Sequence, residues 1–170
     1  MAKMSKKKKG CGTTHDGIRA QGFFRLQICE QDGRVSGDSG WIENQITNEG
    51  FQDYLCQTLA GMAGSKTVAY AMLGTGTVPG ATATSLHGEI VDVATTRCAV
   101  TPTTIASKTV QFAFTLASSV YTAPKTIQNV ALINHSSTAI AGTIFAGNVY
   151  TTSALQTNQS VYGSYQVRFS

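Results

Sequence analysis

Apolar residues recur at every second position in several segments of the chain. In residues 22–30, Phe24, Leu26 and Ile28 alternate with polar or small side chains. A period of two is typical of a strand with one buried face, so this segment predicts a strand. Gly163 interrupts a similar pattern near the end of the chain and predicts a bulge there. Apolar patterns predict further extended segments over residues 41–46, 67–73, 89–100, 107–117, 126–134, 142–150 and 160–170.

A different spacing marks residues 48–60, where apolar side chains lie three or four positions apart and predict one helix. Thr47 or Asn48 can cap its start, and Gly61 can end it. We expect this helix to lie on a sheet or to plug it. Its apolar residues are Phe51, Tyr54, Leu55 and Leu59.

Seven or eight short strands and one helix predict a mainly β fold, a β-sandwich or jelly roll. At 170 residues, the chain fits a single domain, which we place at residues 21–170, after an arm at residues 1–20. Burial of apolar side chains is expected to supply most of the stability. The expected core residues are Phe51, Tyr54, Leu55, Leu59, Phe112, Phe114, Val130 and Leu132.

Positive charge is concentrated in the arm. The net charge of the chain is +4, and five lysines at its start account for it, so the rest of the chain is close to neutral. Like charges and few large apolar groups cannot offset chain entropy, so we expect residues 1–20 to be disordered when alone. The lysines that form this partner-binding arm are Lys3, Lys6, Lys7, Lys8 and Lys9.

The four cysteines, Cys11, Cys29, Cys56 and Cys98, are widely spaced and are expected to be free thiols. No apolar run of the length of a secretory signal follows the lysines, and no stretch of about 18 apolar residues could span a bilayer. We therefore expect assembly in a reducing cytoplasm.

The long segment 74–89 contains glycines and one proline, and it is expected to form a loop. Its start lacks the Gly-Lys-Ser/Thr ending of a phosphate-binding loop, so an interface role is favoured over a nucleotide site. The residues of this candidate interface loop are Gly74, Thr75, Gly76, Thr77 and Pro79.

Other candidate chemistry is weak. Cys11 and His15 could supply two metal ligands, but a zinc site needs three or four. Ser85, His87 and Glu89 could form a triad on paper, but a triad is recognised by its geometry and not by closeness in sequence. We therefore expect no catalytic residues, no metal and no cofactor.

Several short motifs follow one another in a set order between residues 43 and 170. They are Thr47-Asn48-Glu49-Gly50, Gly74-Thr75-Gly76-Thr77 with Pro79, Thr84-Ser85-Leu86 with Glu89, Arg97, and IQNVALIN at residues 127–134. In this order they resemble a family of small tailed-bacteriophage virion proteins of the tail, tail-fibre or head-decoration type. Ala131 stands where that family more often has glycine, and residues 1–42 lie outside the resemblance. The resemblance implies a β-sandwich subunit of a virion, with no catalytic residues.

These observations predict a non-enzymatic structural protein of a bacteriophage virion, either a capsid-decorating or cementing subunit or a tail or neck subunit. Its expected partners are other virion proteins and further copies of itself, with no membrane contact. One alternative is a module that binds a host receptor or glycan through its loops. A second is a nucleic-acid-binding protein whose lysine arm neutralises phosphates, which would make binding salt-dependent. No aromatic residues accompany those lysines to stack on bases.

Overall fold

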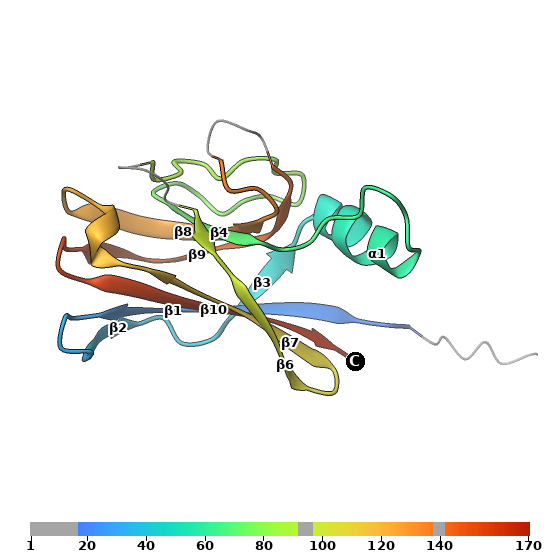
Figure 1. Ribbon diagram of the computed structural model, residues 1–170, viewed down its shortest axis with the longest axis horizontal. Helices are drawn as coiled ribbons and strands as arrows, with labels where there is room; N and C mark the ends of the chain where they lie inside the picture. Colours follow the sequence, from blue (N-terminus) through green and yellow to red (C-terminus); the bar gives the residue numbers. More distant parts are fainter. Residues whose placement is uncertain (1–16, 92–96, 138–141) are drawn as a thin grey trace, which may run out of the picture.

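The computed structural model describes residues 17–91, 97–137 and 142–170, and it is mainly β (Figure 1). Within these residues, ten antiparallel strands form one continuous sheet that folds over into two layers. A single short helical segment lies at one end of the two layers. The predicted β-sandwich with one helix is therefore confirmed.

The lower layer in Figure 1 is built around β1 and β10, which pair with each other along their whole lengths. Its strands are β1 (Ala20–Cys29), β2 (Val35–Asp38), β10 (Ser160–Phe169), β7 (Thr109–Leu116) and β6 (Thr101–Ala106). The upper layer consists of β9 (Ile144–Leu155), β8 (Lys125–Ile133), β4 (Tyr70–Gly74) and β5 (Cys98–Ala99). A short 3-10 turn, η2 (Ser118–Val120), precedes β8.

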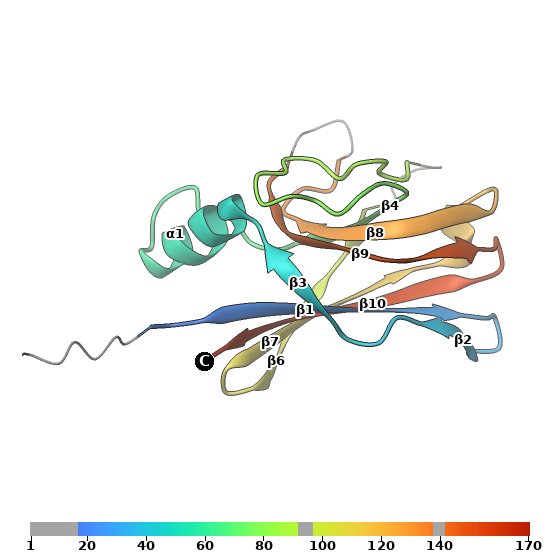
Figure 2. The same cartoon turned by 180° about the vertical axis from the view of Figure 1, so that it is seen from behind.

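Two segments connect the layers. β3 (Ile42–Ile46) pairs with β1 through its first residues and with β9 through Gln45 and Ile46, so it rises from one layer to the other, as Figure 2 shows from behind. On the opposite side, the second connection runs from β5 in the upper layer to β6 in the lower layer. These two strands follow each other in the chain but occupy the two ends of the strand order. The sheet is therefore nearly closed around its core.

Aromatic side chains fill the space between the layers. The ring of Tyr165 lies 4.6 Å from that of Phe24 and 5.9 Å from that of Phe145, measured between centroids. Phe145 also lies 5.2 Å from the ring of Tyr54, which comes from the helix. The helix thus contributes to the same core as both layers. Of the expected core residues, Tyr54, Phe114, Val130 and Leu132 are buried, and Leu55 and Phe112 are partly buried against this cluster.

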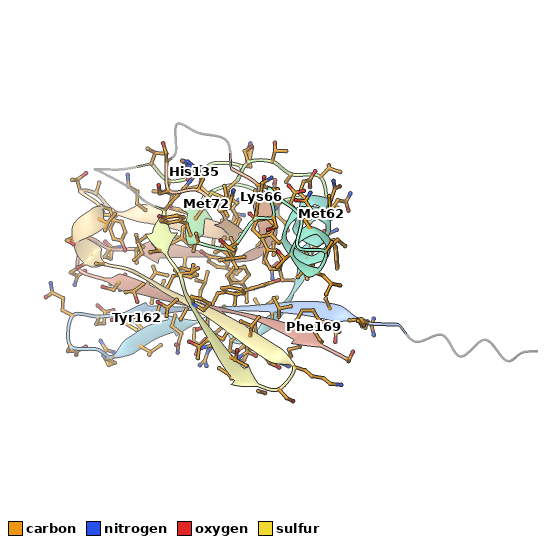
Figure 3. The ribbon with its side chains drawn as sticks, turned by 45° about the vertical axis from the view of Figure 1, so that its right-hand side comes forward. Met62, Lys66, Met72, His135, Tyr162 and Phe169 are labelled. Carbon is orange, nitrogen blue, oxygen red and sulfur yellow. The ribbon has the colours of Figure 1, made fainter. Side chains whose placement is uncertain are left out.

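A second, smaller core lies on the outer face of the upper layer. The loop of residues 75–90 folds back over β4 and β8, as seen at the top of Figure 1. The side-chain amide of Asn129, which is fully buried, donates to the carbonyl oxygens of Thr77 and His87 at 2.8 and 3.0 Å. This amide fastens the loop to the sheet. Leu86 of the loop packs there with Met72, Ala131, Ile133 and Ile144, of which Met72 is labelled in Figure 3.

The helix predicted over residues 48–60 is confirmed in its position and its ends. It comprises η1 (Gly50–Cys56), which has π-type hydrogen bonding, and α1 (Gln57–Leu59). The Thr47 hydroxyl accepts a hydrogen bond from the Gly50 N–H at 2.9 Å, and Gly61 follows the helix with a φ of 62°. Two core predictions are wrong here, because Phe51 and Leu59 are 43% and 88% exposed.

Other predictions from the sequence need correction. β10 keeps an unbroken register with both neighbours at Gly163, so the predicted bulge is wrong. In the described part of residues 89–100, only a bridge from Glu89 to Gly74 and the two-residue β5 are found. β2 and β6 were not predicted, because their residues are mostly polar and largely exposed, so no apolar alternation marks them.

Candidate functional site

An apolar groove lies between the helix and the lower layer, at the end where β1 begins and β10 finishes. Its volume is about 660 Å³. Phe169 of β10, labelled in Figure 3, marks this end of the lower layer, whereas Tyr162 lies at the other. The main apolar lining residues are Ile18, Ala20, Phe51, Leu55, Leu59 and Phe169.

Large apolar side chains stand exposed around this groove. Ile18 is 84% exposed, Leu59 88% and Phe51 43%. Among the described residues that line the groove, Lys108 is the one with a charged side chain. Single exposed apolar residues are normal on a protein surface, but a cluster around a hollow is typical of an interaction site.

A second apolar hollow continues the groove on the other side of the helix. Its volume is about 290 Å³, and it shares Tyr54, Leu55, Thr58 and Phe169 with the first. From there it reaches Phe112 and other apolar side chains of β7 and β10. The helix therefore bridges the open end of the sandwich and leaves apolar surface accessible on both of its sides.

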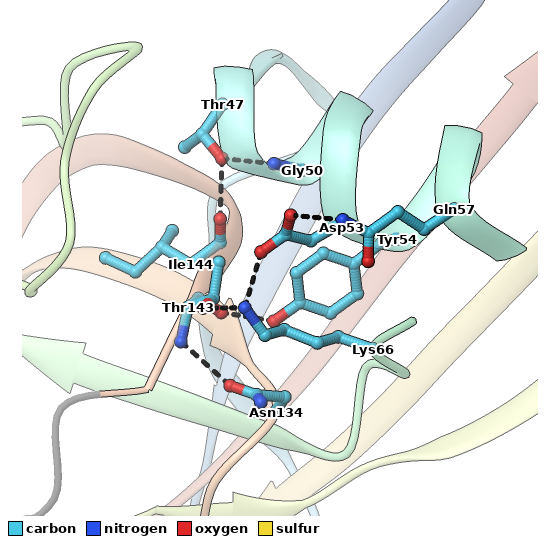
Figure 4. Close-up of polar contacts among 9 residues, drawn as sticks. All are labelled: Thr47, Gly50, Asp53, Tyr54, Gln57, Lys66, Asn134, Thr143 and Ile144. Atoms are coloured by element: carbon cyan, nitrogen blue, oxygen red, sulfur yellow. Dashed lines mark hydrogen bonds and ion pairs between the residues drawn. The ribbon is translucent and has the colours of Figure 1, made fainter. Parts of the chain in front are cut away.

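Polar contacts attach the helix to the upper layer (Figure 4). The Tyr54 hydroxyl donates to the Thr143 carbonyl oxygen. Lys66, which follows the helix, forms an ion pair with Asp53 and donates to the Thr143 hydroxyl at 2.7 Å. The Asn134 side chain accepts from the Thr143 N–H at 2.8 Å. These bonds link the helix to Asn134, which follows β8, and to Thr143, which precedes β9, so the upper wall of the groove has a defined position.

The electrostatics of this network suit a structural role. Burial raises the pKa of Tyr54, and the nearby charge of Asp53 raises it further. The phenol is therefore neutral across the physiological range and keeps the proton that it donates to the Thr143 carbonyl oxygen. The groove itself offers apolar contact area, together with the exposed thiol of Cys56.

Another cavity, of about 190 Å³, lies between the layers at the opposite end. Several of its polar groups are already engaged within the protein, whereas the buried hydroxyl of Tyr150, which also lines it, has no hydrogen-bond partner among the described residues. The Asp38 carboxylate accepts hydrogen bonds from Arg25, Gln27 and the Gly40 N–H, and the Ser39 hydroxyl accepts from the Leu26 N–H. The bond from Arg25 is the main cause that lowers the pKa of Asp38 to about 2. Among the described lining residues, the Tyr150 hydroxyl is therefore the buried group left to orient a ligand in this cavity.

The candidate interface loop is found packed against the upper layer. Gly74 is the buried last residue of β4, and Pro79 is buried against Gly147 of β9. Thr75 and Thr77 are exposed, and Gly76 is partly buried. The lysines of the predicted arm, and Cys11 and His15, lie outside the described residues.

The structure does not bring Ser85, His87 and Glu89 together as a triad. Both carboxylate oxygens of Glu89 accept hydrogen bonds from Arg97, at 2.7 and 3.0 Å. Arg97 also donates to the carbonyl oxygens of His135 and Ser137. Glu89 and Arg97 of the motif series are thus a structural ion pair, with Arg97 buried and Glu89 partly buried. Within the described ranges, no three His, Cys, Asp or Glu side chains are grouped so as to hold a metal ion.

The groove was missed from the sequence, although its residues carried a signal. The apolar positions of the helix were all assigned to one core, whereas only some of them face the sheet.

In the described part of the chain, no helix has the length and apolar character needed to cross a membrane. Comparisons with family models, with curated proteins and with solved structures find no match for this chain.

Proposed function

We propose that the chain is a non-enzymatic structural protein of a bacteriophage virion, which works by packing against neighbouring protein subunits. It is either a capsid-decorating or cementing subunit or a tail or neck subunit. The observation that carries this proposal is the apolar groove beside the helix, with Ile18, Phe51 and Leu59 exposed around it.

Burying such a surface against a partner protein is favourable without any chemical reaction. Removing apolar area from water contributes about 25 cal/mol per Å². A fully covered Leu or Ile side chain therefore contributes about 1.5–3 kcal/mol before the costs of association. The assignment to a virion rests on the ordered motifs between residues 43 and 170. Two residues of these motifs, Glu89 and Arg97, form an ion pair that fastens loops of the upper layer.

Incorporation into particles tests this function directly. Phage particles are assembled with the wild-type chain or with Leu59→Lys, and the purified particles are assayed by quantitative mass spectrometry. We expect the wild-type chain in the particles and Leu59→Lys to be depleted from them, because a charge in the groove opposes burial. Val35→Lys, which changes an exposed apolar residue on β2, is the matched control. Particles that lack the wild-type chain would refute the proposal.

Deletion of the lysine-rich start distinguishes a docking arm from the alternative of a nucleic-acid-binding protein. A chain lacking residues 1–9 is compared with the full chain for incorporation and for binding to duplex DNA at several salt concentrations. Lost incorporation supports a docking arm. Unchanged incorporation with lost, salt-dependent DNA binding supports nucleic-acid contact through Lys3 and Lys6–Lys9.

A further inference from the structure

We infer that the partner covering this groove is a second copy of the same chain, placed by a two-fold axis beside the start of β1. The inference rests on the proposed function, since it identifies one of the neighbours against which the subunit packs. Three features of the same face support it: protruding apolar side chains, a hollow that fits them, and an unpaired strand edge.

The protruding side chains and the hollow that fits them occur together on one surface. Ile18 and Leu59 project at 84% and 88% exposure, and the hollow between them is lined by Ala20, Leu55 and Phe169. In a two-fold dimer, the same patch of both copies forms the interface, so the patch must be complementary to itself. A face that carries both shapes meets this requirement.

The edge of β1 is open at the same place. Arg19 exchanges two backbone hydrogen bonds with Ser170, at 2.9 and 3.0 Å. Backbone groups of successive residues in an antiparallel pair point to opposite sides, so those of Ile18 and Ala20 point away from β10. On that side, β3 joins β1 only from Gly22 onward. No strand among the described residues pairs with Ile18 or Ala20 there.

Antiparallel pairing of two such edges brings the three features together. A two-fold axis perpendicular to the sheet lets the open edge of one copy pair with that of the other, and the lower layers then form one sheet. Ile18 and Ala20 project to the same face of β1, because side chains alternate along a strand. The Ile18 side chain of each copy therefore meets the groove of its partner, beneath Leu59 and Phe51.

The chemistry of the groove argues against the chain's own lysine-rich start as the occupant. Residues 3–9 contain five lysines, and burying unpaired ammonium groups against apolar side chains is strongly unfavourable. Among the described residues that line the groove, no side chain carries a carboxylate to pair with them. An apolar occupant is required, and the matching residues of a second copy provide it.

Light scattering and sedimentation of the purified full-length protein test the inference. We expect a monomer–dimer equilibrium that shifts with protein concentration. Ile18→Lys and Leu59→Lys should each weaken dimerisation by at least about tenfold, which corresponds to about 1.4 kcal/mol. Val35→Lys, which adds the same charge at an exposed apolar site at the other end of the sandwich, should leave the dimer unchanged. Circular dichroism serves as the control that each variant is folded.

Two further variants report on the geometry. Ala20→Pro removes the backbone N–H that faces the open edge and should weaken the dimer, while thermal unfolding of the dilute monomer changes little, because proline is tolerated where the N–H faces solvent. Cys56 is exposed and lines the groove. In a Cys11→Ser background, its reaction with a maleimide should slow as the dimer population rises.

The outcomes separate the inference from the proposed function. A protein that remains monomeric at every concentration, or dimers that keep wild-type affinity in both groove variants, would overturn the inference. If such a monomer still enters particles, the proposed function stands without it. If the dimer forms through the groove but the chain is absent from particles, the inference stands and the proposed function fails.

Discussion

Gly163 of β10 lies directly opposite Phe114 of β7, and the aromatic ring occupies the space where a side chain would begin. A Cβ atom built at Gly163 would lie 1.9 Å from the Phe114 ring. Glycine is therefore required for close packing here. The sequence marked the position as unusual, but a glycine in a strand is compatible with a bulge or with a close contact, and only the neighbouring strand decides between them.

Gly163→Ala is therefore expected to destabilise the protein by about 1–3 kcal/mol, because the added methyl group overpacks the core. Urea denaturation measures the loss. Combining it with Phe114→Leu, which frees space beside the new methyl group, should restore part of the stability relative to the sum of the two single changes. Simple addition of the two losses would show that the two residues do not compete for the same space.

A second prediction at this scale concerns Asp38, whose pKa is lowered to about 2 chiefly by the hydrogen bond from Arg25. A lowered pKa in the folded state stabilises the protein above the unfolded value of about 3.9, and this stabilisation is lost as the pH falls towards 2. Asp38→Asn should thus cost stability near neutral pH and little at pH 2. The pair is partly exposed, so the difference should stay below about 1 kcal/mol. A constant difference across this pH range would contradict the assignment.

At the scale of elements, the helix shows what a sequence pattern can predict. Its existence, its Thr47 cap and its Gly61 ending followed from local rules that depend on neighbours in the chain. The exposure of Phe51 and Leu59 could not be predicted by such rules, because it depends on how much of the helix the sheet covers. The groove was unpredictable for the same reason.

The contacts that hold the helix can be tested separately from its exposed face. Tyr54→Phe removes the hydrogen bond to the Thr143 carbonyl oxygen and should cost about 1 kcal/mol. Backbone amides of residues 50–59 should then exchange hydrogen faster. In dilute protein, Leu59→Ala on the same helix should change stability by less than about 0.5 kcal/mol, because Leu59 is 88% exposed. Equal losses in the two variants would show that the exposed face also supports the fold.

For the whole molecule, the alternation of apolar residues predicted a two-layered β fold, and the structure has one. The order of the strands could not be predicted, since pairing of β1 with β10 and of β4 with β8 joins residues far apart in the chain. The second core beneath residues 75–90 was also missed. Its cover is rich in glycine and threonine, a composition typical of an exposed loop.

Arg97 links three distant segments: the end of the covering loop through Glu89, the residues after β8, and the start of β5. It is 7% exposed. Arg97→Met leaves the Glu89 carboxylate without this cation and should destabilise the protein by about 3–5 kcal/mol in urea denaturation. The double variant Arg97→Met/Glu89→Gln should recover much of that loss, because no unpaired charge remains. A double variant as unstable as the single one would show that the carbonyl contacts, and not the ion pair, dominate.

The pairing of β1 with β10 also sets the order of events during synthesis. β1 is synthesised before all the other strands of the sheet, and β10, which pairs with it from Ala20 to Cys29, is synthesised after all of them. Until Ser160–Phe169 emerges, one whole edge of β1 has no partner, and Phe24 lacks the Tyr165 ring on which it packs. The nascent chain must therefore hold an incomplete lower layer while all the intervening strands are synthesised, and the core can close only after β10 has left the ribosome.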